Sequence, residues 1–271
     1  MTTTGPSAAG AGPAIEVCDL VAAFGDLLVL DHVSMRVEHG EVRVVLGPSG
    51  CGKTTLLKHV IGLLTPQSGS VRLLGEDLLA LSEDALALML SRIGMLFQGG
   101  ALIQSMSLLD NVKLPLREHT QLDADSIDLV ARIKLAIVGL GRFGDYRPSE
   151  ISGGMRKRAA LARALAQDPE VLFCDEPTAG LDPVTAAGID RLILDLRDAL
   201  GLTVVVISHE LRSIRRIADR VTMLHSGVVV ADGDLDELEA SNDPRIRSFF
   251  TGGEEHAAAG EGALLEELFI D

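Results

Sequence analysis

A glycine-rich run of eight residues has the residue types and spacing that bind a nucleotide phosphate. The run, Gly47-Pro-Ser-Gly-Cys-Gly52-Lys53-Thr54, matches the pattern G-x4-G-K-[ST] and lies between an expected strand and an expected helix. Glycines allow backbone N–H groups to turn inward around a phosphate, and the N-terminus of the following helix adds positive potential. We therefore predict a nucleotide site at this run, called the phosphate loop below.

The side chains of the phosphate loop have separate expected roles. The Lys53 ammonium can bridge the β- and γ-phosphates, and the Thr54 hydroxyl can coordinate Mg²⁺. Cys51 has two interpretations: its oxidation could block the nucleotide, or it is a small residue that simply fits, which we favour. The nucleotide is expected to contact Gly47, Pro48, Ser49, Gly50, Cys51, Gly52, Lys53, Thr54 and Thr55.

Two adjacent carboxylates end an expected strand further along the chain. The stretch Val171–Cys174 is apolar, and Asp175 and Glu176 follow it directly. Because successive side chains of a strand point to opposite sides, the two carboxylates cannot do the same job. We expect Asp175 to hold Mg²⁺, usually through water, and Glu176 to orient and polarise an attacking water. Most such pairs are solvated ends of strands, but the phosphate loop favours the hydrolytic interpretation.

Strands and helices alternate along the chain in a way that favours a parallel sheet covered on both faces. Helices between about residues 107 and 167 interrupt this alternation, and there Ile127, Val130, Ile133 and Ile137 are expected on one helix face. The expected strands are 15–17, 27–30, 33–37, 41–46, 71–74, 93–97, 171–174 and 203–207, and the expected helices include 56–64, 82–92, 153–166 and 189–200.

Composition excludes several classes of protein. The 24 Lys and Arg residues against 39 Asp and Glu residues give a net charge of −15, which disfavours a chain that coats nucleic acid. The longest apolar runs, 204–207 and 228–231, are far shorter than the roughly 20 residues that span a bilayer. The N-terminus lacks the features of a secretory signal, and three cysteines cannot form a disulfide framework. We expect a reduced, cytoplasmic protein.

A third motif gives the chain a family resemblance. In Ile151-Ser-Gly-Gly-Met155 a serine and two glycines open an expected helix, so a hydroxyl and backbone N–H groups form a second anion-binding surface. Its position before Asp175-Glu176, with Arg156-Lys157-Arg158 after it, resembles the ATP-binding cassette (ABC) ATPase family, whose signature is usually Leu-Ser-Gly-Gly-Gln. The departures at residues 151 and 155 leave the anion-binding atoms intact.

The resemblance implies a fold, cofactors and a partner. The fold is α/β, with a RecA-like parallel-sheet core, an N-terminal antiparallel β subdomain and an inserted helical subdomain. ATP and Mg²⁺ are the implied cofactors, with Thr54, Gln98 and Asp175 at the metal. The implied assembly is a head-to-tail homodimer with two shared sites, in which the partner's phosphate loop holds the γ-phosphate against Ser152, Gly153 and Gly154.

Four further positions follow the family pattern. Phe24 is where an aromatic ring usually stacks on adenine, although a core aromatic is the alternative. Gln98 matches the glutamine that senses the γ-phosphate and Mg²⁺ and links to the membrane partner. Asp182, in Ala179-Gly-Leu-Asp182, matches the carboxylate that crosses the dimer interface. His209 matches the switch histidine at the γ-phosphate, so Glu176, His209 and Gln98 are the implied catalytic residues.

The resemblance is sharper in and before the helical insertion. The segments 95–102, 110–112 and 115–120, together with the signature ending in Met155, are similar to the ATPase of Mce/Mla-type lipid transporters. This similarity implies permease subunits and Mce-type lipid-binding proteins as partners, a lipid cargo, and a place at the cytoplasmic face of the membrane. Lipid as cargo follows from family resemblance and from no physical property of these residues.

Other functions stay open at this point. A DNA- or ribosome-associated ABC ATPase usually carries a second cassette, long coiled coils or zinc cysteines, and none is visible. A regulator that binds nucleotide without hydrolysis is disfavoured by Glu176, Gln98 and His209. The ATPase of an importer for polar solutes or amino acids is the main alternative.

The chain is expected to divide into three parts. Residues 1–13 are expected to be disordered, 14–250 to form the ATPase domain with its helical subdomain at about 99–167, and 251–271 to form an acidic tail. In the tail Leu264, Leu265, Leu268 and Phe269 line one side of a short helix, which predicts docking on a partner surface.

Overall fold

The structure is a computed structural model, and it describes residues 12–251. Strands and helices alternate through this part of the chain. Apart from residues 12 and 13, the expected disordered N-terminus lies outside the described residues, and so does the expected docking helix of the tail. The strands are β1 (Ile15–Phe24), β2 (Leu27–Val37), β3 (Val42–Leu46), β4 (Ser68–Leu73), β5 (Glu76–Asp77), β6 (Ile93–Leu96), β7 (Val171–Asp175), β8 (Thr203–Ile207), β9 (Arg220–His225) and β10 (Val228–Gly233). The α-helices are α1 (Lys53–Val60), α2 (Glu83–Leu90), α3 (Leu108–His119), α4 (Ala124–Ile137), α5 (Gly153–Ala164), α6 (Pro183–Leu200), α7 (Leu211–Ile217) and α8 (Leu235–Glu239).

The strands form two sheets of different kinds. One sheet has the order β10-β9-β3-β8-β7-β6, and its strands run parallel except for β10, which is antiparallel to β9. The other has the order β2-β1-β4-β5 and is antiparallel throughout. The expected combination of a parallel core with an N-terminal antiparallel sheet is confirmed.

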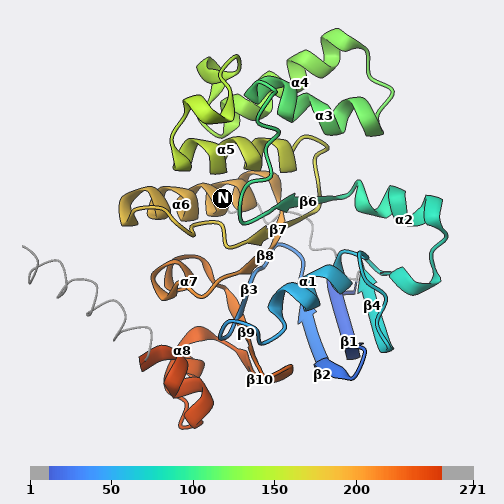
Figure 1. Cartoon of the computed structure of the whole chain (residues 1–271), viewed down its shortest axis with the longest axis vertical. Helices are drawn as coiled ribbons and strands as arrows, with labels where there is room; N and C mark the ends of the chain where they lie inside the picture. The colour runs from blue at the N-terminus through green and yellow to red at the C-terminus, as the bar shows by residue number, and fades with distance from the viewer. Residues whose placement is uncertain (1–11, 252–271) are drawn as a thin grey trace, which may run out of the picture.

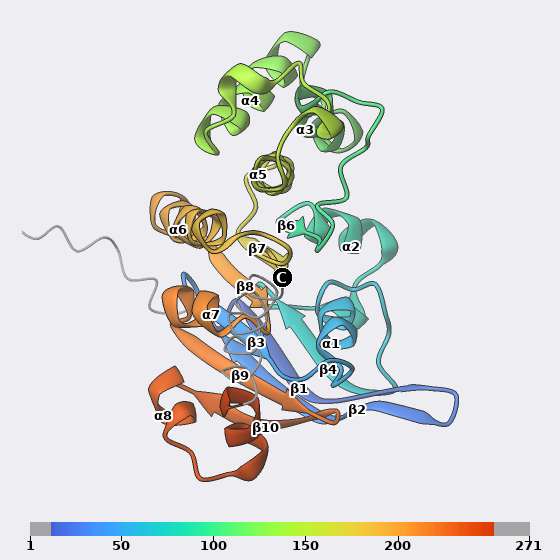
Figure 2. The same ribbon diagram turned by 60° about the vertical axis from the view of Figure 1, so that its left-hand side comes forward.

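The parallel sheet is buried on both faces. In β3 the side chain of Val44 belongs to the core shared with α5, α6 and α7, whereas that of Val45 belongs to the core shared with α1 and the antiparallel sheet. Alternate residues of β7 and β8 divide between the two cores in the same way, as the period of two along a strand requires. Figure 2 shows α6 and α7 on one side of this sheet and α1 and α2 on the other.

The helical insertion lies between β6 and β7. Helices α3, α4 and α5 gather at one end of the molecule, beyond the edge strand β6 (Figure 1). The contact between α5 and β6 is close, because a Cβ atom at Gly94 would lie 2.5 Å from the carbonyl oxygen of Ala164. The insertion therefore meets the strand that leads to Gln98.

Two details of the sequence interpretation were wrong. The expected strands 27–30 and 33–37 are one strand, β2, and β1 continues to Phe24. The chain passes through irregular register at Asp19 and His32, both with positive φ, and their side chains bond at 2.7 Å. The polar residues at this irregularity therefore led the sequence analysis to predict two strands where the structure has one.

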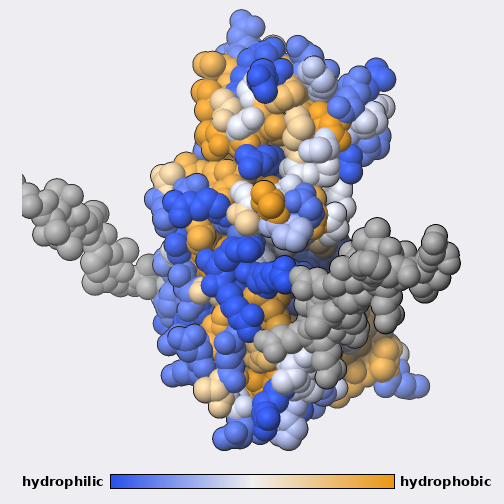
Figure 3. All heavy atoms as spheres, turned by 90° about the vertical axis from the view of Figure 1, so that its left-hand side faces the viewer, coloured by the Kyte–Doolittle hydropathy of each residue, from blue (hydrophilic) through white to orange (hydrophobic). Residues whose placement is uncertain are grey.

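The second error concerns the buried face of α4. Ile127 is buried, but Ile133 is 48% and Ile137 is 41% exposed, and Ala131 and Leu135 are buried instead. The buried stripe includes a charged residue, Lys134, whose ammonium bonds the Asp168 carboxylate, and this lysine hid the true stripe in the sequence. Apolar side chains are visible at this end of the molecule in Figure 3. None of the helices within residues 12–251 is long and apolar enough to cross a membrane.

Candidate nucleotide site

Four neighbouring parallel strands end in the residues that the sequence singled out. Strand β3 leads into the phosphate loop, β6 into Gln98, β7 into Asp175 and Glu176, and β8 into His209. These strands are adjacent in the sheet, in the order β3-β8-β7-β6. Because the carboxyl ends of parallel strands share one edge, the fold gathers these residues at that edge, where ligands of open α/β sheets bind.

The backbone of the phosphate loop has conformations and contacts that favour glycine. Gly47 has φ 147°, and a Cβ atom there would lie 2.1 Å from the carbonyl oxygen of Leu224. Gly52 has φ 106° and precedes α1, and its Cβ atom would lie 2.6 Å from the Leu30 side chain. The loop is thus held between β9 and β2, and larger residues at these two positions would displace it.

The N-terminus of α1 is available to an anion. Side chains cap each helix from α2 to α6, whereas α1 begins at Gly52 with no side-chain cap. The Lys53 ammonium donates to the carbonyl oxygens of Gly47 at 2.7 Å and Pro48 at 2.9 Å, so it is folded over the loop. Uncapped N–H groups beside an ammonium fit a phosphate, which accepts stronger, charge-assisted bonds than a carbonyl does.

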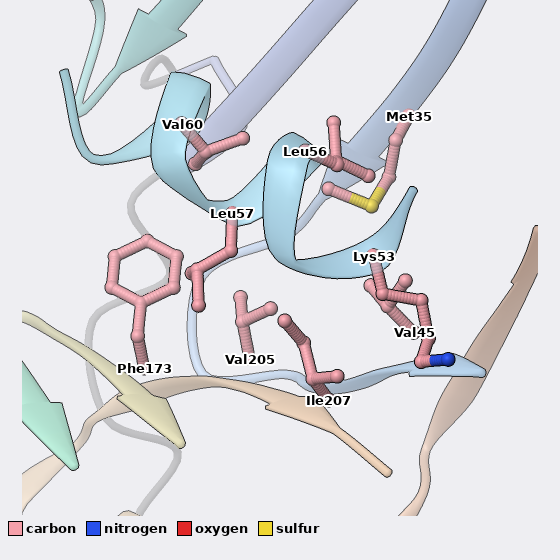
Figure 4. Close-up of a pocket in the computed structure, with 9 residues that line it drawn as sticks. All are labelled: Met35, Val45, Lys53, Leu56, Leu57, Val60, Phe173, Val205 and Ile207. Carbon is pink, nitrogen blue, oxygen red and sulfur yellow. The ribbon is translucent and has the colours of Figure 1, made fainter. Parts of the chain in front are cut away.

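The underside of α1 is a packed core. Figure 4 shows Leu57 directed toward Phe173 and Val205 of the parallel sheet, and Leu56 beside Met35 of β2. The cavity left between them has a volume of only about 10 Å³, which is far smaller than a ligand pocket. The helix is therefore fixed from below, and its free N-terminus is the part that faces a ligand.

Cys51 packs inside the phosphate loop. Its side chain is buried, and its Sγ would lie 2.8 Å from a Cβ atom at Gly47. The thiol lies 3.9 Å from the Lys53 ammonium. This placement supports the interpretation of Cys51 as a small residue that fits.

The two carboxylates at the end of β7 have different surroundings. Burial and the neighbouring Glu176 raise the pKa of Asp175, although Lys157 and Lys53 oppose that shift. Glu176 is 8% exposed and has φ 48°, a conformation rare outside glycine. Its Oε1 lies 2.6 Å from Nδ1 of His209. The left-handed backbone therefore turns Glu176 toward the residue that follows β8.

The signature residues open α5 beside the start of α6. The Ser152 hydroxyl accepts from the backbone N–H of Met155 at 3.3 Å and caps α5. Asp182 caps α6 by accepting from the backbone N–H groups of Val184 and Thr185. A hydrogen bond with the Thr185 side chain, together with these backbone bonds, lowers the pKa of Asp182. Gly154 packs against Thr185, since a Cβ atom at residue 154 would lie 2.4 Å from the Thr185 methyl group.

Phe24 lies in the antiparallel sheet, at the end of β1 opposite Leu27. Its side chain is 53% exposed, which leaves the ring open to stacking. The β2 strand of the same hairpin reaches the phosphate loop through the close approach of Leu30 to Gly52. The hairpin of β1 and β2 therefore carries Phe24 at one point and contacts the phosphate loop at another.

Two residues of the site have no clear signal in the sequence. Lys157, on α5, is buried and donates to the backbone carbonyls of Gln98 and Glu176. Ser208 is fully buried, and its hydroxyl accepts from the N–H of Glu210, next to His209. Spacing could not identify either, because the partners are backbone atoms or local turns. Within residues 12–251, no three His, Cys, Asp or Glu side chains are grouped to hold a metal.

Several known proteins are similar in sequence to this chain. A family model described as ABC transporter matches residues 30–179. MlaF of Escherichia coli strain K12, an intermembrane phospholipid transport system ATP-binding protein, is 42% identical over 238 residues, which are 88% of each chain. The mkl protein of Mycobacterium tuberculosis strain H37Rv, a probable ribonucleotide transport ATP-binding protein, is 43% identical over 89% of this chain and 67% of its own length.

Solved structures share the fold. A dimeric ATP-binding cassette in a post-hydrolysis state, bound to ADP and phosphate, has a TM-score of 0.74 and 30% identity, covering 82% of this chain and 98% of that one. The cbiO1 protein of Clostridium perfringens, part of the cbiONQ transporter complex, has a TM-score of 0.79 and 28% identity, covering 86% and 92%. With the phosphate loop and the acidic pair both inside the matched family region, the chain belongs to the ABC transporter family as its ATP-binding, ATP-hydrolysing subunit.

Proposed function

We propose that this chain supplies the energy of ATP hydrolysis to a Mce/Mla-type lipid transporter, with a phospholipid, a fatty acid or a sterol as cargo. The observation that carries the proposal is the 42% identity with the phospholipid transport protein MlaF over 88% of both chains. An alignment of 238 of the 271 residues includes the helical insertion, the part that contacts a permease in this family.

The geometry of the site supports the following nucleotide contacts. ATP lies along the phosphate loop and the uncapped N-terminus of α1, with Lys53 moving from its carbonyl partners to the β- and γ-phosphates. Phe24 stacks on adenine through its exposed ring. Glu176 orients the attacking water and accepts a proton from it, and His209 and Gln98 face the γ-phosphate from the neighbouring strand ends.

The metal is Mg²⁺. A hydroxyl (Thr54), a carboxylate (Asp175) and an amide (Gln98) are the hard oxygen donors that Mg²⁺ prefers, and these residues would hold it together with phosphate oxygens and water. A bound cation would lower the pKa of Asp175, which partial burial and the neighbouring Glu176 raise. Bound Mg²⁺ would neutralise charge on the β- and γ-phosphates.

The catalytic unit is a head-to-tail homodimer. Ser152 and Asp182 open the adjacent helices α5 and α6, and both residues are exposed. In the dimer Ser152, Gly153, Gly154 and Asp182 complete the site built on the partner's phosphate loop. The dimeric state of a cassette with 30% identity supports this arrangement.

The dimer is part of a membrane-bound complex. We place it at the cytoplasmic face of the cell membrane, attached to integral permease subunits, with Mce-type lipid-binding proteins further out in the same complex. The net charge of −15 gives no support to a nucleic-acid partner.

A polar solute is the second candidate cargo. It is favoured by the 43% identity to the mkl protein, whose name assigns it to ribonucleotide transport. The two cargoes differ enough in chemistry that a single reconstitution separates them.

The test is transport by the purified complex. The full chain is tagged, the complex is isolated with its permease, and vesicles containing it receive labelled phospholipid, fatty acid or ribonucleotide. Lipid movement that requires ATP and stops in a Glu176→Gln complex supports the proposal. ATP-dependent ribonucleotide uptake without lipid movement would establish the second candidate instead.

A further inference from the structure

A buried lysine connects the signature helix to two loops of the ATP site. Lys157 lies on α5 and is 7% exposed. Its Nζ donates to the backbone carbonyl of Gln98 and, at 2.9 Å, to that of Glu176. Burial lowers the pKa of Lys157, while the nearby Cys174, Asp175 and Glu176 oppose that shift. The ammonium is therefore directed at two backbone carbonyls of the site.

The loop after β6 is attached to α5 at more than one point. Arg163, also on α5, donates to the carbonyls of Ala101 at 2.6 Å and Gly100 at 2.9 Å. Gly100 and Ala101 have φ 74° and 48°, which turn the backbone sharply. Three of the four carbonyls from Gln98 to Ala101 thus bond α5, and the loop must follow that helix when it moves.

The backbone at Glu176 needs external support. A non-glycine residue with positive φ is strained and persists only where its surroundings hold it. The N–H of Glu176 donates to Ile207 at 2.9 Å, His209 bonds its carboxylate, and Lys157 bonds its carbonyl. Of these three contacts, the one with Lys157 comes from the helical insertion.

We propose that Lys157 is a positioning residue for ATP hydrolysis, which ties the backbones of Glu176 and Gln98 to the signature helix α5. Movement of α5 or of the Gln98 loop is then transmitted to Glu176, whose carboxylate faces the attacking water. The inference rests on the assignment of that role to Glu176.

The positioning role of Lys157 depends on the hydrogen-bond donors of its ammonium group and not on the size of its side chain. Lys157→Met keeps the length of the side chain and removes its donors, whereas Lys157→Gln keeps an amide that donates to a carbonyl. We expect the methionine variant to lose about tenfold or more in kcat while KM for ATP stays within about twofold, because a displaced catalytic group slows chemistry without weakening phosphate binding. The glutamine variant should fall between the methionine variant and the wild type.

The experiment measures three properties of the full-length ATPase: kcat and KM, the melting temperature, and hydrogen exchange of the peptides that cover 97–102 and 175–181. Lys134→Met is the matched control, because Lys134 is also a buried lysine of the helical insertion but bonds Asp168 outside the site. Exchange in the two peptides should rise for Lys157→Met and stay unchanged for Lys134→Met.

Wild-type kcat in Lys157→Met overturns the inference, and so does a loss shared equally by Lys134→Met or left unrelieved by Lys157→Gln. If the methionine variant does not fold, Lys157→Gln decides: unchanged exchange in both peptides overturns the inference, and faster exchange with lower kcat supports it. Glu176→Gln is measured in parallel. Full turnover in that variant refutes the role of Glu176, whereas an inactive Glu176→Gln beside a fully active Lys157→Met refutes only the role of Lys157.

Discussion

Nδ1 of His209 lies 2.6 Å from Oε1 of Glu176, so the residues that follow β8 and β7 form one hydrogen-bonded pair. Glu176 is almost buried, whereas the His209 side chain is 63% exposed. An ionised carboxylate can only accept, so Nδ1 of His209 carries the hydrogen of this bond. The pair links the carboxylate that we propose to orient water to an exposed imidazole ring.

Glu176→Gln should keep ATP binding and lose most hydrolysis. The amide keeps the size of the side chain but cannot accept a proton from water, and loss of a general base costs about 10²–10⁴-fold in rate. Steady-state ATPase assays and ATP-binding titrations check this, and size-exclusion chromatography with ATP should show more dimer. Turnover near that of the wild type would sink the assignment.

His209→Ala should lower kcat by about 100-fold with ATP affinity kept, because Glu176 loses the partner that orients it. His225→Ala is a matched control, since His225 ends β9 and bonds Ser226. A parallel loss in both variants would mean that the effect does not come from the contact between His209 and Glu176.

Lys53→Ala and Ser152→Arg chains should each be inactive alone and active when mixed. A head-to-tail dimer of the two has one interface with an intact Lys53 facing an intact Ser152, so verified heterodimers should show about half of the wild-type activity. Heterodimers are isolated with two different tags, and each homodimer is assayed beside them. No recovery in such heterodimers would count against shared sites.

The residues at the carboxyl ends of the parallel strands could be predicted from the sequence, because the patterns that identify them are local. The phosphate loop, the acidic pair after β7 and Gly201 as the end of α6 follow from residue types at fixed spacing, and Gly201 indeed has φ 68°. Strand β8 was predicted with its exact bounds, Thr203–Ile207, because it is a continuous β-branched run.

What sequence could not provide depends on contacts between distant segments. Lys157 reaches Gln98 and Glu176, which are 59 and 19 residues away, and backbone carbonyls leave no residue-type signal. The face of α4 was misassigned because Lys134 is buried by pairing with Asp168, contrary to the usual exposure of lysine. Tertiary partners, and not local patterns, decide such positions.

Asp175→Asn should stabilise the nucleotide-free fold while it removes Mg²⁺-dependent activity. Burial raises the pKa of Asp175, so the folded state binds the proton of this carboxyl more tightly than the unfolded state does. Above the pKa of the folded state the carboxyl is charged, and this charge destabilises the fold. The advantage of the variant should be present at pH 7 and vanish as pH falls to about 3.8, the ordinary pKa. Thermal unfolding at pH 7 and at pH 3.8 checks this prediction, and a melting temperature of the variant no higher than that of the wild type at pH 7 would contradict it.

Gly154→Ala should destabilise the fold, and Thr185→Ser should reverse that effect. The new methyl group would lie 2.4 Å from Cγ2 of Thr185, and overpacking costs typically about 1–3 kcal/mol. Serine removes Cγ2 and keeps the N–H that caps α6 on Asp182, so the double variant should recover most of the lost stability. Thermal unfolding of the four proteins gives the coupling energy. Gly188→Ala is the control, because its methyl group would be in ordinary contact, 3.4 Å from Arg158, and alanine favours the helix by about 1 kcal/mol. A Gly154→Ala protein as stable as Gly188→Ala, or a double variant no better than the single one, would show that α5 and α6 do not meet as closely as the structure has them.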